Sequence, residues 1–390
     1  MKMPAALSLL LLVACAAAPP RPAVDYAGDA AALDRLIVDN YAYEDHWPDG
    51  ALPDSDVLAR ERAAVHDDDS LLHYAEDRIT SLADHHAITG SSFKDSWALV
   101  PSYADLWVLR RGDAYVIDAV KPGSPAADAG IVAGDGLAAV GGVATADAVV
   151  AFWQALGLPL TAERADYAAR VLAAGRRDRS RDLSVVHDGA VRRLTLPNLY
   201  AAETADRPPL AVSRDAVGAT VLRLNNSLGD QATIAAFDAA MQALPVDAAV
   251  VVDLSDTPSG GNTSVARALM GWFVDRAQAY QLHQLPAEER ETGIPRQWIE
   301  QVLPRPGKRY RALPVVRVGR WTGSMGEGLA IGFAALGARV EGTRMAGLKG
   351  AVYDFELPSS KLVVKFPAER LYTVDGQPRE DFVPERETAD

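Results

Sequence analysis

A serine and a lysine in the last quarter of the chain have the residue types and the spacing of an acyl-transfer site. Ser324 lies in Gly323-Ser-Met-Gly-Glu327, and Lys349 follows 25 residues later in Gly347-Leu-Lys-Gly350. A serine hydroxyl becomes a strong nucleophile only when a base removes its proton, and a lysine kept neutral by burial can be that base. A purely structural interpretation also exists, because Ser-x-x-Glu is a capping box that closes the start of a helix.

The serine is expected at a sharp turn between a strand and a helix. Leu313 to Gly319 has the apolar, β-branched pattern of a strand, and Leu329 to Leu336 has the small apolar residues of a packed helix. Such a turn exposes the hydroxyl and directs the positive end of the helix dipole towards developing negative charge.

A second turn of this kind precedes the first. Ala248 to Leu254 is almost entirely apolar and predicts a buried parallel strand, and Val265 to Val274 predicts a helix. Gly260 and Gly261 lie in the turn between them. Adjacent glycines there let backbone N–H groups point into a crevice, as an oxyanion hole requires. One such turn is ordinary, but two in successive βα units predict a composite site.

On these residues the chain resembles the carboxyl-terminal processing and tricorn-type serine proteases, which share a crotonase-like α/β core. The match consists of Asp253-Leu254 with Pro258-Ser-Gly-Gly261, of Ser324-Met-Gly-Glu327, and of Lys349-Gly350. The resemblance implies a layered α/β core with Ser324 as nucleophile and Lys349 as base. It also implies that the backbone N–H groups of Gly261 and Met325 form the oxyanion hole.

The chain departs from the family pattern at three positions. Ser255 and Thr257 replace an arginine and an asparagine, and Tyr353 replaces a glutamine that follows the lysine in the processing enzymes. Tyr353 could hydrogen-bond the lysine amine instead.

These departures leave room for a second base. Tricorn-like relatives use a histidine from the amino-terminal region, and the segment Leu82 to Thr89 offers His86 at that place. An imidazole suits proton transfer near neutral pH. Lys349 and His86 both remain candidates. The resemblance also implies a carboxylate near the carboxyl terminus, for which Glu380 is the candidate, although it equally suits a solvated loop.

Residues 104–196 resemble a PDZ domain. The matching core is Gly123-Ser-Pro-Ala126, followed by Ala129-Gly-Ile131 and Gly134-Asp135. PDZ domains add an extended peptide to a sheet edge and often capture its free carboxylate, so the resemblance implies a polypeptide partner recognised through its C-terminus. Alternatively the module only packs on the core and gates access to it. The basic run Arg176 to Arg181 is expected to be a solvated face.

The amino terminus predicts export and a lipid anchor. Residues 1–14 have the charged start and short apolar core of a signal peptide, and Leu12-Val-Ala-Cys15 resembles a lipobox. Cys15 is the only cysteine, so no internal disulfide is possible. We expect a lipid on Cys15, a linker over residues 15–24 and a periplasmic, outer-membrane location. The alternative is a plain secretory signal cleaved near Ala17 or Ala18.

Composition is that of a folded, multidomain protein. Hydrophobic residues make up 49%, and the net charge of −13 argues against a nucleic-acid partner. No motif predicts a metal or a cofactor. We expect an α/β multidomain fold: a helical region at 25–103, the PDZ-like domain at 104–196 and the peptidase core at 197–390. Leu282 to Val302 interrupts the core as a lid or a surface insertion.

Two functions are compatible with this sequence. One is a serine endopeptidase that cleaves envelope proteins through an acyl-enzyme on Ser324. The other is a non-catalytic peptide- or ligand-binding lipoprotein on the same scaffold.

Overall fold

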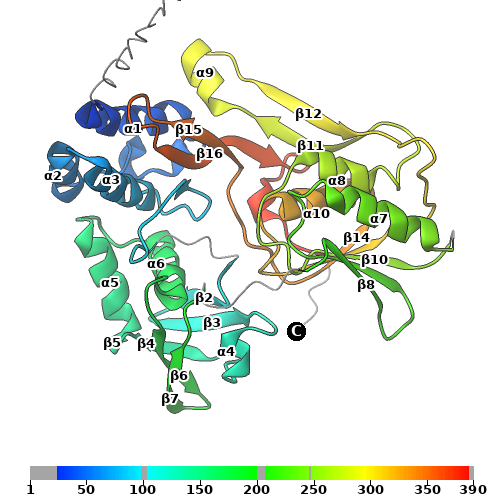
Figure 1. Ribbon diagram of the computed structural model, residues 1–390, viewed down its shortest axis with the longest axis horizontal. Helices are drawn as coiled ribbons and strands as arrows, with labels where there is room; N and C mark the ends of the chain where they lie inside the picture. The colour runs from blue at the N-terminus through cyan, green and yellow to red at the C-terminus, as the bar shows by residue number, and fades with distance from the viewer. Residues whose placement is uncertain (1–23, 98–102, 200–206, 246, 386–390) are drawn as a thin grey trace, which may run out of the picture.

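The computed structural model describes residues 24–97, 103–199, 207–245 and 247–385, which form three sheets flanked by helices (Figure 1). The anchor prediction at Cys15 lies outside these residues. No helix in the described ranges is both long and apolar enough to cross a membrane.

The amino-terminal region is helical, as its periodicity predicts. Each helix begins at a side-chain cap, in which Asp25, Ser55 and Asp67 accept backbone N–H groups of the first turn. The apolar faces of the first and third helices pack with Val364 and Phe366 of a later strand in one shared core, whereas Leu58 of the second helix joins the core of the next domain. The helices are α1 (Tyr26–Asn40), α2 (Asp56–Ala64) and α3 (Asp68–Thr80), with 3-10 turns at Glu44–His46 and Pro48–Gly50.

The segment with the PDZ-like pattern forms a six-stranded antiparallel sheet in the order β2-β3-β4-β6-β7, with β5 beside β4. Helices α5 and α6 pack on this sheet, and Trp153 is fully buried between them. The elements are β2 (Leu106–Arg111), β3 (Ala114–Val120), α4 (Pro125–Asp128), β4 (Gly136–Val140), β5 (Val143–Ala144), α5 (Thr145–Ala155), α6 (Ala162–Ala174), β6 (Arg181–His187) and β7 (Ala190–Leu196).

The expectation of a solvated basic run is wrong at its end. Arg181 is buried and pairs with the Asp105 carboxylate at 2.7 Å. A buried guanidinium needs such a partner, because an unpaired charge there would be costly.

The core sheet has the order β14-β13-β10-β9-β8, and all neighbouring pairs are parallel except β8 with β9. The strand expected at Ala248 to Leu254 is its central strand β10, buried along its whole length. The elements are β8 (Leu210–Arg214), β9 (Thr220–Leu224), α7 (Ala232–Ala243), β10 (Val250–Asp253), α8 (Thr263–Met270), β13 (Val315–Val318), α10 (Met325–Ala335) and β14 (Arg339–Gly342).

The third sheet has the order β1-β16-β11-β12, with β15 beside β16. The stretch Leu282 to Val302 contains α9 and the edge strand β12, and its two strands belong to this sheet because β11 pairs with both β12 and β16. The elements are β1 (Ile88–Thr89), β11 (Gln278–Gln284), α9 (Pro286–Thr292), β12 (Gln297–Val302), β15 (Ala351–Glu356), β16 (Val363–Tyr372) and a 3-10 turn at Arg379–Asp381.

This third sheet places distant segments side by side. In Figure 1, β15 and β16 lie between the amino-terminal helices and the core. Strand β1, which begins two residues after His86, pairs with β16. The chain after Lys349 enters β15 directly. The segments that carry the two candidate bases therefore meet.

Candidate active site

The two predicted turns lie next to each other because β10 and β13 are parallel neighbours. Their ends are joined by a bridge between Thr257 and Thr322, and the Gly323 N–H donates to the Thr257 carbonyl at 2.9 Å. The Thr322 hydroxyl donates to the Leu254 carbonyl at 2.8 Å. The turn that carries Ser324 is thereby fixed against the Gly260-Gly261 turn.

Ser324 has a strained backbone, with φ 52° and ψ −115°. Positive φ is costly for a residue with a side chain, and such strain concentrates at functional sites. The buried carboxylate of Glu327 holds this conformation by accepting the N–H groups of Ser324 and Gly347, both at 2.8 Å. Burial raises the pKa of Glu327 to about 7. Ser324 and Glu327 therefore form the capping box that the sequence predicts, and the hydroxyl of Ser324 makes a further contact besides.

The hydroxyl of Ser324 faces an imidazole. Its Oγ lies 3.1 Å from Nε2 of His86, a residue 238 positions earlier in the chain. The other ring nitrogen, Nδ1, lies 2.6 Å from the carbonyl oxygen of Lys349. A carbonyl can only accept a hydrogen bond, so Nδ1 must carry the proton. The Nε2 lone pair of the neutral ring is then directed at the serine hydroxyl.

The charge state agrees with this tautomer. Burial, together with the positive charge of Arg379, lowers the pKa of His86 to about 4. The imidazole is therefore neutral near pH 7 and can accept a proton.

The side chain of Lys349 points elsewhere. Its amine forms an ion pair with Glu163 of α6 at 2.9 Å and lies 5.7 Å from the centre of the Tyr43 ring. Burial opposes the charged amine, but the carboxylates of Asp84 and Glu163 outweigh it and raise the pKa of Lys349. A cationic lysine cannot remove a proton, so this geometry does not support Lys349 as the base. Its backbone carbonyl orients His86 instead.

Buried hydrogen bonds to Asp84 hold the backbone of His86 in place. The Asp84 carboxylate accepts the His86 backbone N–H and the Tyr41 hydroxyl, each at 2.8 Å. His85 turns away and stacks on Tyr167 of α6 with ring centres 4.2 Å apart. It is thus packed against the second sheet domain.

The backbone groups expected to form an oxyanion hole lie in the same cavity as Ser324. Among the described residues, no hydrogen-bond acceptor is found for the N–H of Gly261 or of Met325. Close approach explains both glycines. A Cβ on Gly261 would lie 2.4 Å from the Leu228 carbonyl, and one on Gly260 would lie 3.2 Å from Ser324 Oγ.

Two supporting residues have no signal in a local motif. Asn226, with φ 53°, accepts the N–H and the hydroxyl of Ser259 and so fixes the glycine turn. Arg379 is buried and donates to the carbonyls of Leu348 and Gly350, which holds the segment that contacts His86. Asn226 at positive φ is a common exception to the glycine rule, but only the fold shows what it holds.

The cavity beside Ser324 has a volume of about 580 Å³ and a polar far wall. His283 contacts Glu369 and lies 3.3 Å from Glu300. Burial opposes its charge, but these two carboxylates raise the pKa of His283 to about 9. Tyr353 donates to Glu369 at 2.8 Å, so it does not hydrogen-bond the Lys349 amine as the sequence suggested.

Glu380 lies in a separate pocket, which it shares with Lys349, Tyr43 and Glu163. The structure does not bring it to Ser324, and its suggested catalytic role stays a prediction. Trp321, next to the serine turn, is buried and donates to the Ala104 carbonyl at 2.6 Å.

Comparison with solved structures identifies the fold. The photosystem II D1 C-terminal processing protease aligns with a TM-score of 0.55 over 94% of this chain and 94% of its own, at 17% identity. Mature CPAF aligns with a TM-score of 0.55 over 93% and 92%, at 15% identity. A putative peptidase from Parabacteroides merdae gives 0.50 over 93% and 89%, at 13% identity.

The chain therefore has the α/β multidomain fold of the carboxyl-terminal processing proteases over about 93% of its length. No protein-family model matches the sequence, and no curated protein matches it. At such low identity the likeness concerns the fold, so the role of each residue must be argued from its geometry.

Proposed function

We propose that this protein is a serine endopeptidase with Ser324 as nucleophile and His86 as general base. One observation carries the proposal: Ser324 Oγ lies 3.1 Å from His86 Nε2 while a backbone carbonyl holds the proton on Nδ1. A nucleophile, a base within hydrogen-bond reach and a group that orients the base are the three parts that activate a serine.

The chemical steps follow from these positions. Ser324 Oγ attacks the carbonyl carbon of a peptide bond while its proton passes to His86 Nε2. The N–H groups of Gly261 and Met325 bind the oxyanion that forms. The imidazolium then protonates the leaving amine, the carbon–nitrogen bond breaks and an acyl-enzyme remains. His86 next removes a proton from water, which attacks the ester carbonyl carbon. The imidazolium returns that proton to Ser324 Oγ as the ester bond breaks, which releases the acid and restores neutral His86 and free Ser324.

Substrate handling is assigned to the 104–196 domain. Its PDZ-like sequence pattern supports recognition of an extended polypeptide through its C-terminus. Contact between this domain and the site supports the same role, since α6 reaches both Lys349 and His85.

We place the enzyme in the cell envelope, anchored by a lipid on Cys15 and acting on envelope proteins. The support is the lipobox-like Leu12-Val-Ala-Cys15 after a signal-like segment. Physiological substrates would then be periplasmic polypeptides.

Cleavage of casein by the purified protein and by Ser324→Ala tests this function. We expect the variant to lose all measurable cleavage while its circular dichroism and melting temperature match those of the wild type. Cleavage retained by a folded Ser324→Ala protein free of other proteases would rule out this site as the source of activity.

A further inference from the structure

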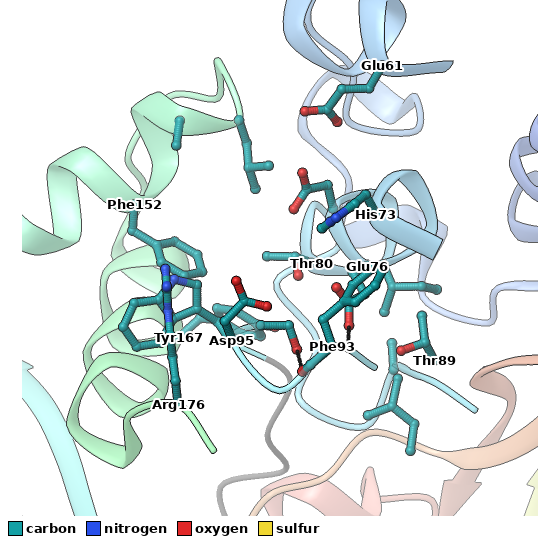
Figure 2. Close-up of a pocket in the computed structure, with 18 residues that line it drawn as sticks. Glu61, His73, Glu76, Thr80, Thr89, Phe93, Asp95, Phe152, Tyr167 and Arg176 are labelled. Atoms are coloured by element: carbon teal, nitrogen blue, oxygen red, sulfur yellow. Dashed lines mark hydrogen bonds between the residues drawn. The ribbon is translucent and has the colours of Figure 1, made fainter. Parts of the chain in front are cut away.

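A second cavity lies behind the active site, between the amino-terminal helices and the sheet domain that follows (Figure 2). Its volume of about 430 Å³ falls in the range of roughly 300–1,000 Å³ that is usual for small-ligand sites. One wall comes from α2 and α3, and the opposite wall comes from α5 and α6. No step of the proposed peptidase mechanism uses it.

The α2–α3 wall and the loop beside it carry an excess of carboxylates. Glu61, Glu76, Asp77 and Asp95 all line the cavity, and no ion pair to any of them is found among the described residues. The Glu61 and Asp77 carboxyl groups hydrogen-bond each other, while Oε2 of Glu61 is buried and has no hydrogen-bond partner there. Glu76 is partly satisfied, since it accepts the Phe93 N–H at 3.1 Å.

Neighbouring carboxylates oppose the ionisation of Asp77. Burial, with the charges of Glu61 and Glu76 beside it, raises the pKa of Asp77 to about 7. A shift of this kind is typical of acidic groups that lack a cation. Arg176 lines the cavity, but its guanidinium lies 4.4 Å from the centre of the Trp97 ring.

Aromatic faces complete the enclosure. Figure 2 shows Phe152 and Tyr167 on the α5–α6 side, facing Glu61, His73 and Glu76 across the cavity. His73 stacks on Phe93 with ring centres 4.1 Å apart, which fixes the loop that closes one end. Carboxylates opposite aromatic faces are the usual environment of a bound organic cation.

A hydroxyl in the same wall also lacks a partner. Thr89 is only 9% exposed, lines the cavity, and its Oγ1 has no hydrogen-bond partner among the described residues (Figure 2). An unpaired buried hydroxyl is costly, and a ligand N–H would satisfy it. Across the described ranges, no group of three or more His, Cys, Asp or Glu side chains could hold a metal ion. An organic cation is therefore favoured over a metal.

We propose that this cavity binds an alkylammonium or alkylguanidinium group, held by Glu61 and Asp77 against the aromatic wall, with Thr89 as an acceptor for a further N–H of the same ligand. The group has two sources with the same chemistry, a free amine or a basic side chain of a polypeptide. Ile88 lines both this cavity and the one that contains Ser324, so an occupant would lie directly behind the strand that follows His86.

Isothermal titration calorimetry tests the site without relying on peptidase activity. The probes are agmatine, spermidine and the blocked peptide acetyl-Ala-Arg-Ala-amide, with the citrulline peptide as its neutral isostere. Peptides are titrated into Ser324→Ala so that they stay intact. We expect the cations to bind and the citrulline peptide to bind at least about 10-fold more weakly, because it lacks the charge.

The double variant Glu61→Gln, Asp77→Asn keeps side-chain size and should weaken cation binding at least about 10-fold. Glu61→Gln alone should also weaken cation binding, and this single variant replaces the double variant in the experiment if the double variant does not fold. Glu291→Gln, an exposed carboxylate on α9, is the matched control and should bind as the wild type does.

The relative affinities of the probes distinguish the two sources of the cation. Tighter binding of agmatine or spermidine assigns the cavity to free amines, whereas tighter binding of the arginine peptide assigns it to polypeptide side chains. No binding of any cation, equal binding of the citrulline peptide, or unchanged binding in the charge-neutral variants would overturn the proposal.

Discussion

At the scale of single residues, the candidate site depends on how one histidine is held. The Nδ1–H group of His86 donates a hydrogen bond to a backbone carbonyl and not to a carboxylate. No full negative charge therefore stabilises the imidazolium directly. Asp84 contributes through the backbone N–H and not through the ring. His86 is accordingly a weak base that is fully available at neutral pH.

This predicts a specific pH profile for kcat/KM. The rate requires neutral His86, whose pKa is lowered to about 4, so it should rise as the pH increases through about 4 and then stay level across neutral pH. Lys349 as base would instead require loss of a proton whose pKa is raised above its ordinary value. A fluorogenic peptide assayed from pH 3.5 to 11 separates the two, and a rate that climbs steadily through pH 10 would refute the histidine.

The two adjacent glycines should respond differently to a methyl group. Gly261→Ala would place a Cβ 2.4 Å from backbone and should cost about 2–4 kcal/mol of unfolding free energy, since the turn must move. Gly260→Ala would place it 3.2 Å from Ser324 Oγ and should slow acylation with little loss of stability. Urea unfolding and active-site labelling of both variants check this, and equal effects of the two changes on both readouts would contradict it.

Local patterns predict some of these residues and not others. Ser324, Gly261 and Met325 follow from two short motifs, because each motif carries its own turn. The direction of the Lys349 amine cannot be predicted from a local motif, since its partner Glu163 lies 186 residues away. His86 and Lys349 therefore could not be separated before the fold placed one ring and one carbonyl together.

At the scale of elements, α6 is the support that links the second sheet domain to the site. Its Tyr167 stacks on His85 and its Glu163 pairs with Lys349. The ring contact is buried and the ion pair is at the surface, so the two contacts should contribute unequally to the free energy of unfolding.

Tyr167→Ala removes a buried aromatic ring and should cost about 3–5 kcal/mol of stability, with a loss of activity because His85 adjoins the base. Glu163→Gln breaks an ion pair whose carboxylate is 52% exposed and should cost less than about 1 kcal/mol, with nearly normal activity. Thermal unfolding and peptide cleavage measure both. Normal activity in a folded Tyr167→Ala protein would show that α6 does not support the site.

The βα units of the core could be predicted because apolar strands and glycine turns are local signals. The place of β11 in its sheet could not be predicted, because its residues pair with residues of β16 that lie about 86 to 90 positions further along the chain, and β12 joins the sheet only through β11. Pro286 and Pro295 interrupt this stretch of sequence, and both lie outside the paired residues.

At the scale of the whole molecule, two of the three sheets meet at one cavity. The core contributes Ser324 and the glycine turn, the third sheet contributes the His283 wall, and the segment before β1 contributes His86. A fold in which nucleophile and base come from different sheets can change its activity by moving one sheet against another.

Anchoring is a property of the full chain. If Cys15 carries lipid, Cys15→Ser should move the protein from the membrane fraction to the soluble periplasmic fraction, because the lipid would be its anchor. Cell fractionation with immunoblotting measures the distribution, and metabolic labelling with a fatty acid is the control. A wild-type protein that is already soluble and unlabelled would exclude the anchor.

The proposed Ser324–His86 pair is tested best by the rate of fluorophosphonate labelling, with the modified residue mapped by mass spectrometry. The label should be on Ser324, should be absent from Ser324→Ala, and should form about 100-fold or more slowly in His86→Ala, because a general base contributes roughly 10²–10⁴. Lys349→Ala, which keeps the backbone carbonyl, should be labelled at nearly the wild-type rate. Loss of labelling in Lys349→Ala together with normal labelling of His86→Ala would contradict this assignment.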